Sequence, residues 1–261
     1  MLPLYRDAAA STPNVSPGLL HFLSKQLNSS ITLQDLVAYV AAVTAHPGFA
    51  RRFAADLKTP GIRIPLSREP ELWMDAVKIG SEVLWLHTYG ERCVAPTLGR
   101  RLGPPRMRTG RPTVRVGIPD TEAGMPERMT YDEITRTLHV GEGEIGPVSP
   151  EVWNYQVSGM PVVKHWFGYR KKNPSGNRKS PLDQIVATSW TSAMTTELLE
   201  LLNVLGRCVE LEPAQRDLLD RIVSGPLIKI ENLTASAVLP ISAAARIIPK
   251  PPRGNDLFSS E

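Results

Sequence analysis

The sequence predicts an α+β fold, with helical N- and C-terminal parts around a strand-rich, loop-rich middle. Apolar residues recur at helical spacing near both ends, whereas short alternating apolar segments lie between residues 61 and 160. Proline, which breaks helices, is abundant at 24 residues in the chain and argues for a loop-rich middle rather than a helical bundle. The chain has 261 residues, of which 42% are hydrophobic, so it can form a core of ordinary size.

The N-terminal part, residues 1–60, is predicted to be a helical hairpin. Its first helix covers the apolar residues of segment 19–27. The second helix begins after Thr32, whose hydroxyl can cap it, and Asp35 follows three residues later at the positive end of the helix. That helix ends near residue 46, and a third begins at Phe49.

The middle part, residues 61–180, is predicted to be a mixed α/β region with basic loops. Strands are expected where apolar residues alternate, and helices where they recur every three or four positions. The expected strands are 62–66, 114–118, 129–131 and 137–140, the last two forming a hairpin, and the expected helices are 69–87 and 162–167. Residues 141–150 are expected to form a turn-rich connector.

The C-terminal part, residues 181–248, is predicted to contain two helices. Thr195 begins the first, and Glu212 with Pro213 begins the second, because proline is favoured in the first turn of a helix. Residues 249–261 are expected to be a flexible tail.

No motif in the sequence predicts catalysis. Residues 141–146 have the glycine spacing of a dinucleotide-binding loop, but Pro147 and Pro150 follow where that motif needs a helix. The sequence lacks a phosphate-binding loop and a nucleophile elbow, and its five histidines are scattered without paired spacing. We therefore expect no catalytic residue and no metal site.

The sequence also lacks membrane and export signals. No apolar run reaches the roughly 18 residues that a membrane helix needs. The two cysteines, Cys93 and Cys208, agree with a reducing compartment. We expect a cytoplasmic protein without a membrane partner.

Positive charge is concentrated in two segments. Residues 92–115 contain basic side chains and no acidic one, and so do residues 156–182, although the formal net charge is only +4. Solvated loops are the simplest interpretation, but such segregation also attracts polyanions, of which nucleic acid is the commonest. The basic residues are Arg92, Arg100, Arg101, Arg106, Arg108, Arg111 and Arg115 in the first segment and Lys164, Arg170, Lys171, Lys172, Arg178 and Lys179 in the second.

These segments contain the candidate DNA-binding residues. Lysine and arginine neutralise phosphates, while arginine and asparagine can also read base edges. The phosphate candidates are Arg170, Lys171, Lys172, Arg178 and Lys179, the base-reading candidates are Asn173, Arg106 and Arg108, and Lys164 and Arg111 are further DNA-binding candidates. Trp166 and Phe167 are expected to pack inward, leaving the charges for DNA. His87, Tyr89 and Arg92 either line a groove or belong to a buried His–Tyr–Glu network.

Several of these segments carry a family resemblance. Residues 49–66 are similar to the stretch of adenine-specific DNA methyltransferases that leads from the methylase helices to the specificity region. Residues 85–92, 129–140 with 146–150, and above all 157–174 with 195–215 resemble the C-terminal target-recognition region of type ISP restriction–modification enzymes. The resemblance implies sequence-specific binding of double-stranded DNA, with residues 1–60 as methylase-side linker helices.

The catalytic motifs of these enzymes are missing from the sequence. The methyltransferase motif Asn/Asp-Pro-Pro-aromatic has only an echo in residues 173–176, which lack the second proline and the aromatic residue. The resemblance therefore implies a stand-alone or truncated specificity chain, inactive alone and working with a methyltransferase, helicase and nuclease polypeptide. S-adenosylmethionine, ATP and Mg²⁺ would serve only the full-length enzymes.

Two other functions remain open from the sequence. One is a remnant or partner-dependent DNA adenine methyltransferase subunit, which binding of S-adenosylmethionine would reveal. The other is a helical protein–protein interaction module that docks through residues 198–219.

Overall fold

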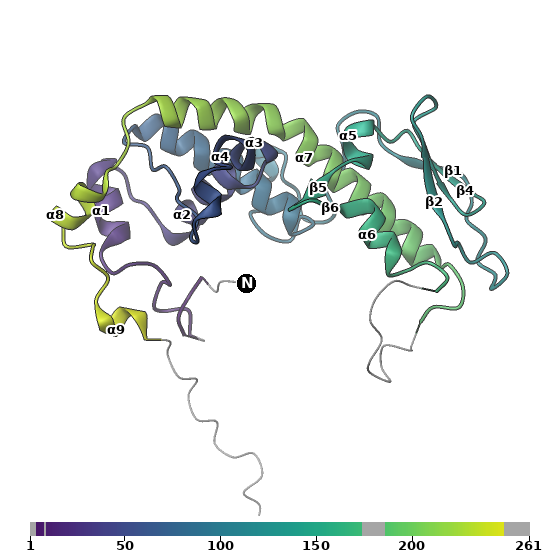
Figure 1. Ribbon diagram of the computed structural model, residues 1–261, viewed down its shortest axis with the longest axis horizontal. Helices are drawn as coiled ribbons and strands as arrows, with labels where there is room; N and C mark the ends of the chain where they lie inside the picture. The colour runs from purple at the N-terminus through teal and green to yellow at the C-terminus, as the bar shows by residue number, and fades with distance from the viewer. Residues whose placement is uncertain (1–3, 8, 174–185, 248–261) are drawn as a thin grey trace, which may run out of the picture. The chain divides into compact units, whose positions relative to one another are not determined.

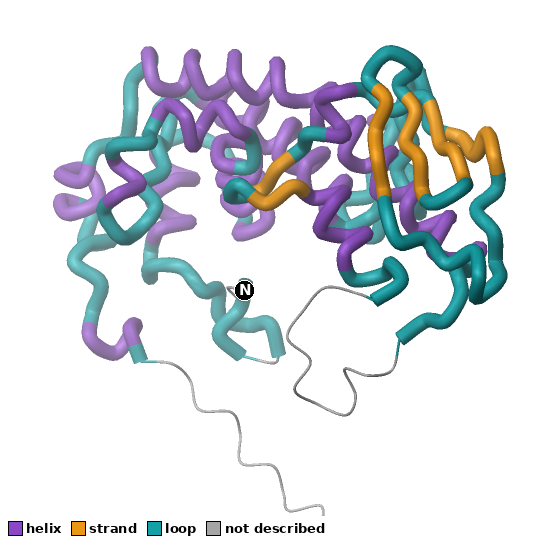
Figure 2. Tube along the Cα trace, turned by 45° about the vertical axis from the view of Figure 1, so that its right-hand side comes forward, coloured by secondary structure: helices purple, strands orange, loops and turns teal. Residues whose placement is uncertain are grey.

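The computed structural model describes residues 4–7, 9–173 and 186–247 (Figures 1 and 2). The predicted α+β fold is confirmed, with helices toward both ends and a sheet in the middle. The helices are α1 (Leu19–Gln26), α2 (Leu33–Thr44), α3 (Pro47–Arg52), α4 (Pro70–His87), α5 (Pro150–Trp153), α6 (Val162–Gly168), α7 (Ser192–Ser224), α8 (Ile230–Ala235) and α9 (Ala243–Arg246), with short 3-10 turns at Asp56–Lys58 and Pro96–Leu98. The predicted tail, residues 249–261, lies outside the described residues.

The chain divides into two compact units. The terminal unit combines Met1–Ser81 with Ala214–Glu261, and the central unit is Glu82–Pro213. Both divisions fall inside helices, α4 and α7. Among the described helices, none combines the length and apolarity that crossing a bilayer requires.

The terminal unit is organised around a stacked pair of aromatic rings. Tyr39 of α2 lies against Trp73 of α4 with ring centroids 4.0 Å apart and planes at 22°. The Tyr39 hydroxyl donates to the Pro65 carbonyl at 2.9 Å and accepts from the Ser67 amide at 2.9 Å, so this buried polar group is satisfied. Leu218 of α7 completes the core. The ring pair thereby fixes the segment between α3 and α4 as well as the two helices.

The predicted cap of α2 is confirmed. The Thr32 hydroxyl accepts from the Asp35 amide at 3.1 Å, and the Asp35 carboxylate accepts from the Thr32 amide at 2.9 Å. The predicted strand at 62–66 is wrong, because this segment runs as a loop whose carbonyl at Leu66 accepts from the Ile228 amide. Its alternation instead reflects Ile64 and Leu66 packing on the helical core beside exposed Arg63.

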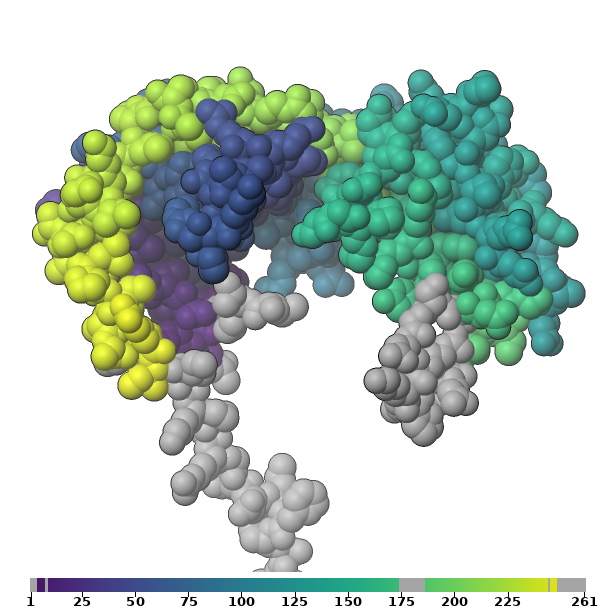
Figure 3. Space-filling model, in the orientation of Figure 1, coloured from purple at the N-terminus to yellow at the C-terminus, as the bar shows by residue number. Residues whose placement is uncertain are grey.

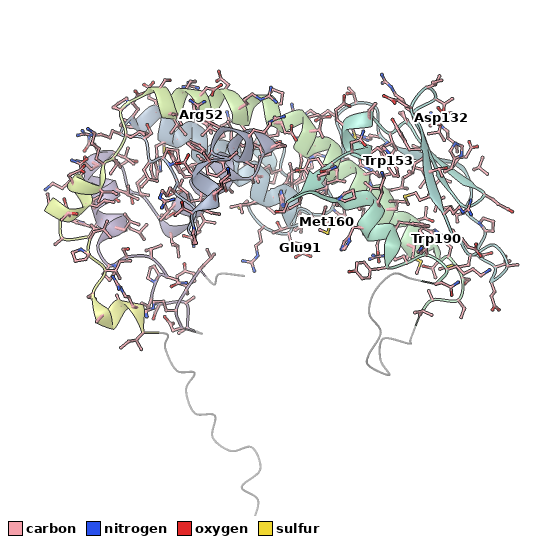
Figure 4. The ribbon with its side chains drawn as sticks, in the orientation of Figure 1. Arg52, Glu91, Asp132, Trp153, Met160 and Trp190 are labelled. Atoms are coloured by element: carbon pink, nitrogen blue, oxygen red, sulfur yellow. The ribbon has the colours of Figure 1, made fainter. Side chains whose placement is uncertain are left out.

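The central unit contains a four-stranded antiparallel sheet. Its strands are β1 (Thr113–Val116), β2 (Met129–Asp132), β3 (Thr137–Val140) and β4 (Gly143–Gly146), in the order β1-β4-β3-β2. The predicted hairpin is confirmed as β2 and β3, with Met129 opposite Val140. Asp132, labelled in Figure 4, accepts from the Ile134 amide and shapes the turn. A two-stranded hairpin, β5 (Gln156–Val157) and β6 (Met160–Pro161), precedes α6.

The prediction of a connector at 141–150 is wrong, because this segment contains β4, an inner strand of the sheet. Gly141 has φ +59 and lets the chain turn sharply from β3 into β4. A Cβ at Gly143 would lie 2.9 Å from the Ile118 Cα, so glycine allows close backbone packing there. Two of the four residues of β4 are glycines, and Ile145 is its one large apolar residue, which is buried in the core. A single apolar residue cannot produce the alternating pattern by which a strand is predicted from sequence.

One face of the sheet is covered by α5, α6 and the first half of α7. Leu138, Val140 and Ile145 of the sheet share a core with Val163 and Phe167 of α6 and with Leu198, Leu201, Leu202 and Leu205 of α7. Figure 1 shows α6 alongside the first half of α7. His139 and Glu144 point to the opposite face, where His139 Nδ1 lies 3.7 Å from a Glu144 carboxylate oxygen.

The predicted pair of C-terminal helices is wrong, because α7 is one helix of 33 residues with Pro213 inside it. Proline removes one helical hydrogen bond at a cost of about 3 kcal/mol. Burial on both sides offsets this cost, since residues 201–208 are buried and Leu218 and Ile222 are buried too. Local proline preference is therefore outweighed by tertiary packing.

Gly80 tests the close packing of α2 on α4. A Cβ at this position would lie 1.7 Å from the Ala38 carbonyl oxygen. An unconstrained Gly→Ala change inside a helix stabilises by about 1 kcal/mol, but here we expect Gly80→Ala to lower the free energy of unfolding by about 2–3 kcal/mol. Chemical denaturation measures the change. Gly117→Ala is the control, since its Cβ would meet no atom within 4 Å, and an equal loss in both variants would contradict the packing argument.

His46 makes the terminal unit sensitive to acid. Burial lowers the pKa of His46, and the guanidinium groups of Arg216 and Arg51 act in the same direction. Because the folded-state pKa lies below the unfolded value of about 6.5, the contribution to stability is complete above that pH and is lost as pH falls below it. We expect Tm to fall from pH 7 to pH 5 in the parent and to fall less in His46→Leu. Identical pH dependence in the two proteins would contradict this.

Candidate nucleic-acid interface

A loop rich in arginine lies on the central unit and is held by its backbone. We call residues 98–111 the arginine loop. The buried Trp85 indole donates to the Arg101 carbonyl at 2.8 Å, and the Asn203 side-chain oxygen of α7 accepts from the Met107 amide at 2.9 Å. These bonds join the loop to the end of α4 and to α7. The loop therefore has a fixed path although, beyond the 3-10 turn that ends at Leu98, it contains neither helix nor strand.

Glycines bring the arginine loop close to the rest of the central unit. A Cβ at Gly90 would lie 1.9 Å from the Gly103 carbonyl oxygen, and a Cβ at Gly206 of α7 would lie 2.3 Å from the Met107 sulfur. Gly90, with φ +81, therefore requires glycine for contact with the loop, whereas a larger residue at Gly206 would displace the flexible Met107 side chain. The backbone faces the protein at Arg101, Gly103 and Met107. Between these points Pro105 is buried, whereas Leu102 and Arg106 face solvent.

The arginines of this loop have different surroundings. Arg100 is buried and donates through Nε to the Cys93 carbonyl at 2.9 Å, so it has a structural role. Arg106, Arg108 and Arg111 are exposed, and within the described ranges they form no ion pair. Arg111 donates to the Met107 carbonyl at 2.7 Å, which orients its guanidinium group.

The arginine loop borders a surface hollow of about 520 Å³. Four arginines line it, namely Arg101, Arg106, Arg111 and Arg207. Only Arg207 has carboxylate partners, Glu82 and Glu210, in the part of the chain that the structure describes. The hollow is consequently cationic and suited to anions.

The second basic segment lies at the end of α6. Lys164 Nζ lies 4.7 Å from the ring centre of Trp153, which is labelled in Figure 4. The Arg170 guanidinium stacks on the Trp166 ring at 4.2 Å and donates to the Glu197 carboxylate at 2.9 Å. These ring contacts hold the cations in place.

The second basic segment, residues 156–182, contains no acidic residue, but in the fold its cations lie next to carboxylates from other segments. Lys172 lies 3.1 Å from Glu127, and Arg170 pairs with Glu197 of α7. Lys171 is half-buried and Asn173 is exposed, with φ +52. The predicted candidates Arg178 and Lys179 lie outside the described residues. Sequence spacing therefore overstated how isolated these positive charges are.

The aromatic residues of α6 pack inward. Phe167 is buried in the core beneath the sheet, and Trp166 is half-buried with its ring edge-on to Trp190 at 6.1 Å. The basic residues 170–172 thus follow directly on a helix that is fixed by apolar contacts.

The third group, at the end of α4, reaches the surface. His87, Tyr89 and Arg92 are exposed, and so is Glu91, which is labelled in Figure 4. The members of the alternative His–Tyr–Glu network thus reach the surface, although partial burial lowers the pKa of His87. Partial burial raises the pKa of Tyr89, and the carboxylate of Glu200 raises it further, while Arg170 lowers it. Tyr89 therefore shares its electrostatic environment with the cationic end of α6.

Comparison with known proteins identifies the family. A family model described as the type ISP C-terminal specificity domain matches residues 1–201. The chain belongs to this family. The resemblance predicted from the sequence is thereby confirmed. No curated protein gives a match.

The fold of this specificity domain also occurs in a solved structure. The cryo-EM structure of a DrdV–DNA complex aligns with a TM-score of 0.52 and 17% identity over 86% of this chain. Two type ISP enzymes give lower scores: the nuclease-deletion mutant of LlaGI with a DNA substrate mimic (0.47, 21% identity, 71% of this chain) and LlaBIII bound to DNA (0.48, 16% identity, 80% of this chain). The chain spans 21%, 16% and 12% of the lengths of DrdV, LlaGI and LlaBIII.

The structure of the specificity domain adds two residues to the candidates. Arg101 and Arg207 line the cationic hollow but were not singled out in the sequence. The basic run gave a signal for Arg101, whereas Arg207 lies in a largely apolar helical segment and gave none. Among the described residues there is no group of three or more histidine, cysteine, aspartate or glutamate side chains that could hold a metal ion.

Asn203 tests how the arginine loop is held in this specificity domain. Asn203→Ala removes the acceptor of the Met107 amide, so we expect the free energy of unfolding to fall by about 1–2 kcal/mol and hydrogen exchange at that amide to accelerate. Thr196→Ala is the control, because Thr196 is exposed on the same helix and its hydroxyl bonds only locally, to Ser192. Unchanged exchange at Met107 in Asn203→Ala would show that the bond does not hold the loop.

Proposed function

We propose that this chain binds double-stranded DNA sequence-specifically, as the target-recognition domain of a type ISP restriction–modification and adenine methyltransferase system. The observation that carries the proposal is the match of the specificity-domain family to residues 1–201. The cationic surface of the central unit supports it, since DNA is the polyanion that a specificity domain must meet.

The arginine loop supplies the strongest phosphate ligands. Arg106, Arg108 and Arg111 are exposed on a backbone that Trp85 and Asn203 hold, so binding orders few additional residues. Each cation that neutralises a phosphate releases condensed counterions, which gives affinity independent of sequence. We assign Arg106 and Arg108 also to base reading, because arginine can contact guanine through two hydrogen bonds.

The end of α6 supplies the second set of contacts. We assign Lys164, Arg170, Lys171 and Lys172 to phosphates, and Asn173 to a base edge. The pairs of Arg170 with Glu197 and of Lys172 with Glu127 lie near the surface, where an ion pair contributes about 0–1 kcal/mol. A phosphate can therefore take the place of the carboxylate at small cost. Arg178 and Lys179 complete the proposed set.

We assign catalysis to a partner polypeptide and not to this chain. On this proposal the chain alone neither methylates nor cleaves DNA nor hydrolyses ATP, and a methyltransferase, helicase and nuclease polypeptide is its partner. S-adenosylmethionine, ATP and Mg²⁺ then act in that partner. We place the complex in the cytoplasm, which the free thiols of Cys93 and Cys208 support. Neither a remnant methyltransferase nor a helical docking module is favoured by the family match.

Salt dependence of duplex binding tests the proposed function. We expect the association constant of the parent to fall steeply with salt, and Lys171→Ala/Lys172→Ala to reduce the magnitude of the log–log slope by about 1–2, one unit for each lost phosphate contact. Arg106→Ala/Arg108→Ala should reduce both the slope and the preference for the selected sequence.

The matched control removes the same charge from the terminal unit. Lys58→Ala/Lys78→Ala deletes two exposed lysines and should leave the slope unchanged. Equal slopes in the parent, the Lys171/Lys172 variant and the Arg106/Arg108 variant would refute the assignment of both basic segments.

A further inference from the structure

We propose that Leu102 is an apolar wedge that enters the base stack of bound duplex DNA, with the neighbouring guanidinium groups on the flanking phosphates. This inference rests on the proposed function and deepens it, because it assigns to the arginine loop a contact that distorts DNA. Leu102 was not among the candidates from the sequence.

Leu102 is exposed although the residues on both sides of it are fixed. Its exposed fraction is 77%, whereas the carbonyl of Arg101 accepts from buried Trp85 and the carbonyl of Gly103 lies against Gly90. Burying a leucine side chain is worth about 1.5–3 kcal/mol. The loop therefore holds an apolar side chain in water at a fixed place, and it does not fold that side chain onto the core.

The surroundings of Leu102 are cationic. It lines the same hollow of about 520 Å³ as Arg101, Arg106 and Arg111. Leu98 of the same loop is also exposed, at 57%, but two leucines set among arginines offer little apolar area to a protein partner, whose interface cores are depleted in charge. This arrangement does match duplex DNA, where apolar base faces lie between rows of phosphates. Figure 3 gives a space-filling view of one face of the central unit, whose colour runs from blue through teal to green.

A wedge of this kind contributes to target choice without hydrogen bonds to bases. Unstacking one base step costs a few kcal/mol, and the cost is lowest at pyrimidine–purine steps such as TA and CA. The arginine cations offset it by approaching the bent backbone more closely. Leu102 thus makes the domain prefer targets with a flexible step at one position, in addition to any base edges read by Arg106 and Arg108.

The test uses duplexes selected from a random library by the parent protein, with 2-aminopurine replacing adenine at successive positions. We expect the parent to increase 2-aminopurine fluorescence at one step, because unstacking relieves quenching. Leu102→Ala should lose most of this increase and bind about 3- to 10-fold more weakly, with the salt slope unchanged. Leu102→Met should retain the signal, since it keeps an apolar side chain of similar length.

Ile134→Ala is the matched control, because Ile134 is an exposed apolar residue of the same unit, in the turn between β2 and β3. It should behave as the parent, and all variants should keep the parent's Tm. Two results would overturn the wedge: a parent that binds duplex without any 2-aminopurine increase, or a Leu102→Ala variant with the full increase. A parent that binds no duplex would instead overturn the proposed function, so the two failures are distinguishable.

Discussion

The central unit depends on the burial of one helical segment from all sides. Residues 201–208 of α7 are all buried, so every face of these two turns meets another part of the unit. The sheet and α6 cover Leu202 and Leu205, Trp85 and Leu86 cover Val204, and the arginine loop covers Gly206. A helix enclosed in this way fixes three otherwise separate parts of the chain relative to one another.

This arrangement explains how loops can form a binding surface. Backbone contacts to Trp85 and Asn203 hold the arginine loop, while apolar contacts of Phe167 hold the end of α6. These contacts already hold the two backbone segments, so on binding their long cationic side chains give up mainly their own rotamer freedom. The same fixed backbone exposes Leu102, which a flexible loop would turn toward the protein.

Charge is distributed less simply than the sequence suggests. Both segments are free of acidic residues in the sequence, but Glu197 and Glu127 approach the second one in the fold. Arg106, Arg108 and Arg111 have no carboxylate partner among the described residues. Glu127 and Glu197 lie outside residues 156–182, so counting charges within that segment of the sequence does not include them. The arginine loop is consequently the more cationic of the two surfaces.

The sequence by itself determined the fold class, the capped helix α2, the β2–β3 hairpin, helix α6 and the family, because each has a local pattern of apolar residues, caps or motifs. Only the tertiary structure decided that β4 is an inner strand and that α7 continues through Pro213. In β4, glycines leave one buried apolar side chain, and in α7 the burial on both sides outweighs the local preference of proline to begin a helix. The hollow that joins Arg101 to Arg207 was decided in the same way, because the residues that meet there are more than a hundred positions apart in the chain.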